Sequence, residues 1–292
     1  MKNYIFIGGV PRSGTSLVQK ILSLHSEIYG GPEFVHLPEL MRLYNHMLEG
    51  IKNNRQKEYY NNDELKYYLR TLISSIFDNK IKLENVNYLS EKTPYNILVF
   101  NELYDLFPAS KYIIVLRDPR GIINSLNQVQ RRAKSYGDNI SFGKNIFSDI
   151  RFIKKVFNIS LKFSENYDNC LIVYYENLLH DSRREVKRIC QFIGVEYEAS
   201  MLDTAKSNSN SKLMGNELTR SWYSKEMYDR SIDRQNSLKW MEELSKLHKS
   251  IINNHFNIFK NKLVDYYNFE NSSMIYRLQA RILYHYLKLK HK

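Results

Sequence analysis

The sequence predicts an α/β fold: one three-layer domain with a central parallel sheet of about five strands, helices on both faces and an extra helical part at the C-terminus. Two observations lead to this prediction. Short apolar runs alternate with segments whose apolar residues recur every three or four positions, the pattern of a parallel sheet covered by helices. A glycine-rich turn also follows the first apolar run, as in α/β domains that bind phosphate.

The predicted elements alternate along most of the chain. Four short, nearly continuous apolar runs are expected to be strands buried on both faces of a sheet. They are residues 4–7, 88–90, 112–116 and 171–174. Helical spacing predicts helices at residues 15–24, 63–77, 96–107, 119–127, 142–166 and 183–193. Residues 199–234 are polar and predict a long loop with short helical pieces, and the whole chain, residues 1–292, is predicted to form a single domain.

The charge balance is basic, with 43 Lys and Arg against 31 Asp and Glu and a net charge of +12. Such an excess is typical of proteins with an anionic partner, which is a nucleic acid, a membrane surface or a phosphorylated ligand. A Lys- and Asn-rich sequence can also simply reflect genome composition. The two cysteines, Cys170 and Cys190, lack the spacing of a zinc site, so they are expected to be free thiols.

Neither end of the chain shows a membrane-spanning pattern. The N-terminal apolar run is too short for a signal peptide, and no stretch approaches about 18 uninterrupted apolar residues. These observations predict a cytoplasmic protein. Residues 274–292 carry basic side chains and apolar residues at helical spacing, which predicts a basic amphipathic helix. That helix either packs as an ordinary terminal helix or makes peripheral contact with the anionic inner face of a membrane.

The first predicted strand ends in a loop with P-loop-like spacing. From Gly9 to Gly14 the sequence fits G-x-x-x-x-G, which aims backbone N–H groups and a helix N-terminus at an anion. Thr15-Ser16 follows Gly14 where a nucleoside triphosphatase has Lys-Thr or Lys-Ser, so the lysine that reaches the β- and γ-phosphates is missing, and the positive charge lies earlier, at Arg12. The loop is therefore predicted to bind a smaller anion, without the usual Mg²⁺ arrangement.

A second basic motif follows the strand predicted at residues 112–116. Arg117 comes directly after that strand, and Ser125 lies eight residues later in the next predicted helix. In α/β sheets, ligands bind at the carboxyl ends of the strands, and arginine suits bidentate contact with phosphate. Asp118 precedes a helix-starting proline, so it is expected to cap that helix rather than to bind a metal.

Together, the two motifs resemble those of sulfotransferases that use 3′-phosphoadenosine-5′-phosphosulfate (PAPS). The segment similar to the 5′-phosphosulfate loop of that family is Arg12, Ser13, Gly14, Thr15 and Ser16. Arg117 and Ser125 resemble the 3′-phosphate motif, at the family's spacing. The resemblance implies that PAPS is the sulfuryl donor, that its product is 3′,5′-phosphoadenosine (PAP), and that no metal is required.

Within this family the motifs are most similar to those of tyrosylprotein sulfotransferases and related bacterial enzymes. Gly31-Pro32-Glu33 falls where these enzymes place a catalytic glutamate, and Glu91-Lys92-Thr93-Pro94-Tyr95 resembles the segment that supplies a lysine to the transferred group. Two further landmarks, at residues 174–178 and 190–194, extend the resemblance over about residues 3–200. One position departs from the pattern: Val35 stands where the tyrosylprotein enzymes have an acceptor-binding arginine.

The resemblance also implies roles for individual residues. Glu33 is expected to be the general base that takes the proton of an acceptor hydroxyl during in-line attack on sulfur. Lys92 and Arg12 are expected to stabilise charge on the transferred group and the departing oxygen. Arg234, in the long loop, is expected to contact the nucleotide.

The sequence therefore predicts a sulfotransferase that moves the sulfuryl group of PAPS to a hydroxyl of a glycan or of a protein tyrosine. The alternative enzyme is a nucleotide-dependent small-molecule kinase with a degenerate P-loop, although the loop lacks the kinase lysine. A nucleic-acid-binding protein is a third class. No recognised nucleic-acid-binding module occurs, so no nucleic-acid partner is expected.

Overall fold

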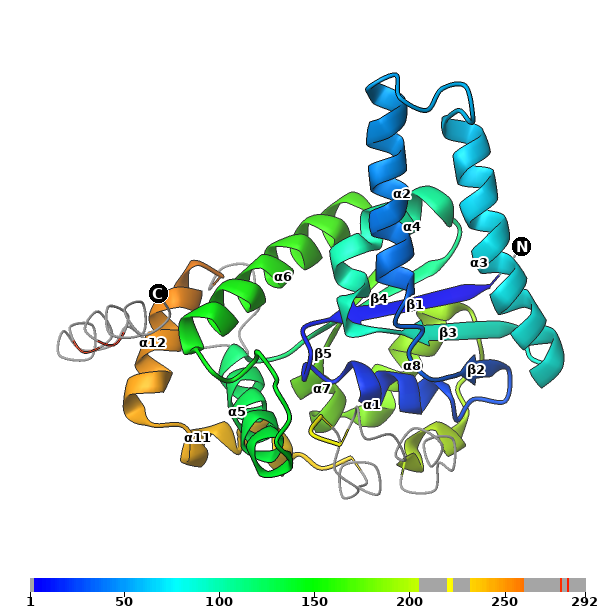
Figure 1. Cartoon of the computed structure of the whole chain (residues 1–292). Helices are drawn as coiled ribbons and strands as arrows, with labels where there is room; N and C mark the ends of the chain where they lie inside the picture. Colours follow the sequence, from blue (N-terminus) through cyan, green and yellow to red (C-terminus); the bar gives the residue numbers. More distant parts are fainter. Residues whose placement is uncertain (1–2, 205–219, 223–231, 260–278, 280–282, 284–292) are drawn as a thin grey trace.

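A five-stranded, fully parallel sheet forms the centre of the molecule, in the strand order β2-β3-β1-β4-β5 (Figure 1). The computed structural model describes residues 3–204, 220–222, 232–259, 279 and 283. The strands are β1 (Tyr4–Gly9), β2 (Ile28–Gly30), β3 (Tyr88–Lys92), β4 (Lys111–Leu116) and β5 (Cys170–Tyr174). This sheet confirms the predicted fold class, including the four strands that the apolar runs predicted.

Helices cover both faces of the sheet, and β1 shows why. Its successive side chains point to opposite faces, so Tyr4 and Phe6 enter one apolar core while Ile5 and Ile7 enter another. The second core is closed by α1 (Thr15–Leu22), α7 (Tyr175–His180) and α8 (Ser182–Ile193). The first is closed by α2 (Leu37–Lys52), α3 (Asn62–Glu84), η1 (Pro94–Val99), α4 (Phe100–Leu106) and α6 (Ile146–Asn166).

The other helices that the structure describes are α5 (Pro119–Tyr136), η2 (Ala199–Leu202), α10 (Gln235–Leu238), α11 (Trp240–Glu243), α12 (Lys246–Phe256) and η5 (Asn257–Phe259). Of these, η2 contacts α1 and α8. In Figure 1, α11 and α12 lie next to α5 and α6, which agrees with the contacts of α11 with α5 and of α12 with both α5 and α6. Asp118 caps α5 as predicted, because its carboxylate accepts the N–H of Arg120 at 2.8 Å.

Several predicted boundaries differ from the structure. The strand β2 and the helix α2 were not predicted, since β2 has three residues and is too short to show a pattern. The prediction for α3 ended at residue 77, whereas the helix continues to Glu84 and ends where Asn85 adopts a left-handed conformation. The helix predicted at 96–107 is a 3₁₀ turn, η1, followed by α4.

Some predictions concern residues outside the described part of the chain. The amphipathic helix at 274–292 lies there except for residues 279 and 283, so its contact with a membrane stays a prediction, as does the single domain over 1–292. Among the helices that the structure describes, none has both the length and the apolar character to cross a bilayer.

Candidate active site

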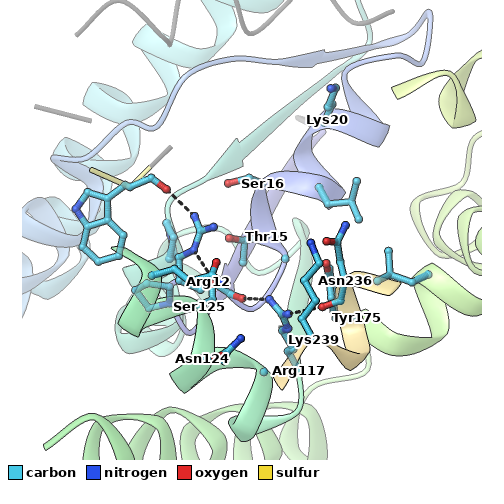
Figure 2. Close-up of a pocket in the computed structure, with 18 of the residues that line it drawn as sticks. Arg12, Thr15, Ser16, Lys20, Arg117, Asn124, Ser125, Tyr175, Asn236 and Lys239 are labelled. Atoms are coloured by element: carbon cyan, nitrogen blue, oxygen red, sulfur yellow. Dashed lines mark hydrogen bonds between the residues drawn. The ribbon is translucent and has the colours of Figure 1, made fainter. Parts of the chain in front are cut away.

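A cavity of about 550 Å³ opens where the strands β1, β4 and β5 end, at the carboxyl edge of the sheet. Its wall combines the loop after β1, Arg117 after β4, the start of α5, Tyr175 after β5, and residues between 232 and 240 (Figure 2). This is the edge at which open α/β sheets bind their ligands. The two motifs predicted from the sequence therefore face one cavity.

The loop between β1 and α1 has a tight backbone conformation. Ser13 N–H donates to the carbonyl of Val10 at 2.9 Å, while Arg12 (φ 76°) and Gly14 (φ 106°) are both left-handed. Gly14 also lies against the ring of Tyr175, where a Cβ atom would clash. Gly14 precedes α1 without a side-chain cap, so the first N–H groups of α1 are directed at the cavity that Thr15 and Ser16 line.

Two arginines tie this loop to the rest of the cavity. Arg12 donates from Nε to the Ser125 hydroxyl at 3.0 Å and from Nη1 to the Trp222 carbonyl at 2.9 Å. Arg117 donates from Nη1 to the Arg12 carbonyl at 3.0 Å, and its guanidinium lies 4.3 Å from the centre of the Tyr175 ring. The predicted residues Arg12, Arg117 and Ser125 thus form one connected group (Figure 2).

Ser13 differs from the other residues of the loop. Its side chain is fully buried, does not line the cavity, and its hydroxyl has no hydrogen-bond partner among the described residues. A Cβ atom on Gly9 would lie 2.8 Å from this hydroxyl, so the serine packs beneath the loop. This geometry indicates that Ser13 shapes the turn and does not line the cavity.

The predicted catalytic carboxylate and lysine meet beside the loop. Lys92, the last residue of β3, forms an ion pair with Glu33 and donates to the Ser16 hydroxyl at 3.2 Å. The Lys92 side chain is 7% exposed and that of Glu33 is 26% exposed, and Glu33 lines the cavity. Tyr95 lines it next to them; burial raises the pKa of Tyr95, and the negative charge of Glu33 adds to the rise.

The structure does not bring Arg234 to this cavity. Arg234 is exposed and donates to the carbonyl of His180, and it lines neighbouring hollows instead. Lys239, which the sequence reasoning missed, lines the main cavity and lies beside Arg117 and Asn236 in Figure 2. Asn236 accepts a hydrogen bond from Arg117 Nη2 through its carbonyl, at 3.2 Å.

The sequence profile of the sulfotransferase family matches residues 4–199, about two thirds of the chain. The chain belongs to the sulfotransferase family. This confirms the family that the two motifs predicted, and it supports sulfuryl transfer as the enzyme's reaction class.

Similar proteins agree with this membership. The chain is 27% identical to protein-tyrosine sulfotransferase A of Caenorhabditis elegans and 28% identical to protein-tyrosine sulfotransferase 2 of Gallus gallus, each over 68% of the chain. The match spans 52% and 53% of those relatives, about half their length. Among solved structures, the sulfotransferase domain of a Synechococcus olefin synthase has the same fold (TM-score 0.57, 21% identity, 84% of this chain and 89% of that domain).

These relatives contradict the predicted location, which was the cytoplasm, either free or at the inner face of a membrane. Protein-tyrosine sulfotransferases are Golgi enzymes of the secretory pathway. The prediction was wrong because it relied on the short apolar run at the N-terminus and the lack of a spanning pattern. Neither observation determines the compartment in which a protein works.

Replacing Gly14 tests the fit between the loop and Tyr175. We expect Gly14→Ala to lower the free energy of unfolding by about 2–4 kcal/mol, because the left-handed φ and the overlap with the Tyr175 ring both oppose a side chain. Urea denaturation measures the change. Gly137→Ala is the matched control: its φ is 73° with no atom within 4 Å, so about 1 kcal/mol is expected. Equal costs for the two variants would contradict the close approach at Gly14.

Proposed function

We propose that the protein transfers the sulfuryl group of PAPS to the hydroxyl of an acceptor. The observation that carries the proposal is the convergence of Arg12 and Arg117 on one cavity, joined by the bond from Arg117 Nη1 to the Arg12 carbonyl. PAPS has anionic groups at two ends, a 5′-phosphosulfate and a 3′-phosphate. Guanidinium groups from two different strand ends, with a helix N-terminus between them, are suited to hold both.

We assign the 5′-phosphosulfate to the loop and the 3′-phosphate to the Arg117 side. The N–H groups that open α1, with the side chains of Arg12, Thr15 and Ser16, provide the donors at the first end. Arg117 and Ser125 provide donors at the second, and Arg117 Nε is a buried N–H without a hydrogen-bond partner in the described part of the chain.

The proposed reaction is a single in-line displacement at sulfur. Glu33 takes the proton of the acceptor hydroxyl as its oxygen attacks sulfur, the bond between sulfur and the bridging phosphate oxygen breaks, and PAP leaves with that oxygen. Lys92 lies within reach of both Glu33 and Ser16, so its ammonium can offset the negative charge that grows on the departing oxygen. No step in this scheme calls for a metal ion.

The acceptor that we propose first is a protein tyrosine, because the relatives above are protein-tyrosine sulfotransferases. A glycan hydroxyl is the second candidate. The observation that favours it is Val35, which is 52% exposed near Glu33 and stands where the tyrosylprotein resemblance leads us to expect an arginine. The basic net charge of +12 suits an acidic segment around either hydroxyl.

Ligand preference is the first test of the donor site. We expect PAP to bind more tightly than 5′-AMP or ATP by about 2 kcal/mol or more, and Arg117→Ala to erase that margin, because a charge-assisted contact to the 3′-phosphate is lost. Isothermal titration calorimetry measures both. Tightest binding of ATP, only with Mg²⁺, would overturn the proposal in favour of the small-molecule kinase.

A charge-neutral substitution tests the general base. We expect Glu33→Gln to lower kcat by about 10²–10⁴-fold because the proton acceptor is lost, and to leave PAP affinity within about threefold. Sulfate transfer from PAPS to tyrosine peptides and to glycans gives the rates. Glu39→Gln is the control: this glutamate is exposed in the first turn of α2 and is paired with His36, so its kcat should not change. A Glu33→Gln enzyme with full kcat would exclude Glu33 as the base.

The two basic residues that flank α10, Arg234 and Lys239, can be compared directly. Lys239 lines the cavity and Arg234 does not, so we expect Lys239→Ala to weaken PAP binding by about tenfold or more and Arg234→Ala to leave it unchanged. Calorimetric titration of PAP into each variant decides between them. The reverse ranking would restore the nucleotide contact that the sequence predicted for Arg234.

A further inference from the structure

We propose that Glu91 is a positioning residue for the reaction: its buried carboxylate accepts the backbone N–H of Phe34 and thereby holds Glu33 in place at the end of β3. This inference rests on the proposed function, because it assigns Glu91 its role through the general base. It adds a residue that does not line the cavity and to which neither the sulfotransferase resemblance nor the mechanism above gives a role.

The segment that carries Glu33 needs such a support. It connects β2 to α2, and its residues Pro32 and Val35 are exposed. Phe34 provides one attachment, since its ring contacts Phe77 of α3 at 5.9 Å between ring centres. The Phe34 ring anchors a side chain of this short, partly exposed connection, and the backbone on either side of Glu33 is left to be fixed by hydrogen bonds.

Two buried side chains provide those hydrogen bonds, one on each side of Glu33. Gln19, from α1, donates through Nε2 to the carbonyl of Gly31 at 3.1 Å and to that of Ser90 at 2.9 Å. Glu91 accepts the N–H of Phe34 at 3.0 Å through Oε1. The backbone is thus attached to β3 both before and after the proposed base.

Glu91 and Lys92 are the last two residues of β3, and they contact neighbouring residues of the segment that carries Glu33. Successive residues of a strand direct their side chains to opposite sides. Lys92 pairs with the Glu33 side chain, and Glu91 takes the N–H of the next residue, Phe34. The end of β3 therefore fixes both the backbone of the segment and the carboxylate that the mechanism uses.

The surroundings of Glu91 show how it is held and how it titrates. Glu91 is 3% exposed and also accepts the Thr93 hydroxyl at 2.7 Å and the Asn96 amide, while Phe6 of β1 pairs with it in the sheet. Lys92 is its charged neighbour among the described residues. Burial raises the pKa of Glu91 to about 7; the hydrogen bonds from Thr93, Asn96 and Phe34 and the Lys92 charge oppose the rise.

The direction of a pH effect follows from this shift. With its pKa raised to about 7, we expect Glu91 to become a neutral acid, the weaker acceptor, as the pH falls below 7, and to be a carboxylate above it. A charged acceptor makes the stronger hydrogen bond to the Phe34 N–H. We therefore expect kcat to rise as the pH passes 7, as the segment that carries Glu33 becomes more firmly held.

Two substitutions of Glu91 separate the accepting oxygen from the charge. Glu91→Met removes the acceptor, and because a misplacement of about 1 Å can cost on the order of 100-fold, we expect kcat to fall at least tenfold with PAP affinity unchanged. Glu91→Gln keeps an accepting oxygen for the Phe34 N–H. Its amide can pair with Asn96 once the Asn96 amide turns over and presents Oδ1, which has no hydrogen-bond partner among the described residues. We expect this variant to keep kcat within about threefold of the wild-type value at pH 6 and to lose the rise near pH 7.

Asp149→Asn is the matched control. Asp149 is a buried carboxyl whose pKa is also raised to about 7 by burial, and it accepts the N–H of Gly143 at 3.1 Å, but it lies on α6. We expect this variant to keep the rise of kcat near pH 7. Loss of the rise in the control, or its persistence in Glu91→Gln, would overturn the assignment to Glu91.

Hydrogen exchange provides a readout that does not require activity. The amide of Phe34 should exchange at least tenfold faster in Glu91→Met than in the wild type, with little change in Glu91→Gln or Asp149→Asn. Unchanged exchange and unchanged kcat in Glu91→Met would overturn the proposal. A wild-type enzyme that transfers no sulfate from PAPS, but whose Phe34 amide still depends on Glu91, would overturn the proposed function and leave the attachment of the segment standing.

Discussion

The parallel pairing of β1 with β3 on one side and β4 on the other is the constraint on which the site depends. All three strands run in the same direction, so the residues that follow them emerge at one edge of the sheet. This brings together the loop that ends at Gly14, Lys92 and Arg117, which are far apart in the sequence. Because β1 is buried on both faces, this edge cannot shift without disturbing both apolar cores.

The loop after β1 is held in its conformation by the same residues that we assign to the donor. Arg12 has a left-handed backbone, which costs a non-glycine residue about 1–2 kcal/mol. Its carbonyl accepts from Arg117, and its side chain donates to Ser125 on α5 and to the carbonyl of Trp222. The hydrogen bonds that offset the strain therefore come from several elements of the cavity wall, so the shape of the loop and the shape of the donor site are coupled.

Much of this arrangement was predictable because it is local in sequence. The spacing from Gly9 to Gly14, and the abrupt change from an apolar strand to Arg117, each mark a strand end suited to bind an anion. Residues that depend on distant packing were not predictable in this way. Glu33 and Lys92 lie 59 residues apart, and the pairing of β2 with β3 brings the segment after β2 to the end of β3; their roles were expected from the family resemblance alone.

Lys239 shows a second reason for failure. It joins two helices of four residues each, α10 and α11, which are too short for a periodic pattern to place. Its position follows from Trp240, whose ring packs against the Arg120 guanidinium at 4.1 Å and is nearly buried. Arg234 precedes α10, and five residues of chain separate this arginine, which does not line the cavity, from Lys239, which does.

Two arginines near the start of α5 differ in how far the fold neutralises their charge. Arg120 is neutralised within the fold, because it forms a two-pronged ion pair with Asp118 and stacks on Trp240. Arg117, three residues earlier, donates to the carbonyls of Arg12 and Asn236 and lies over the ring of Tyr175. Its partners among the described residues orient the guanidinium without cancelling its charge. A half-buried cation with neutral partners is suited to an anionic ligand, and a phosphate group of the proposed donor has the charge to compensate it.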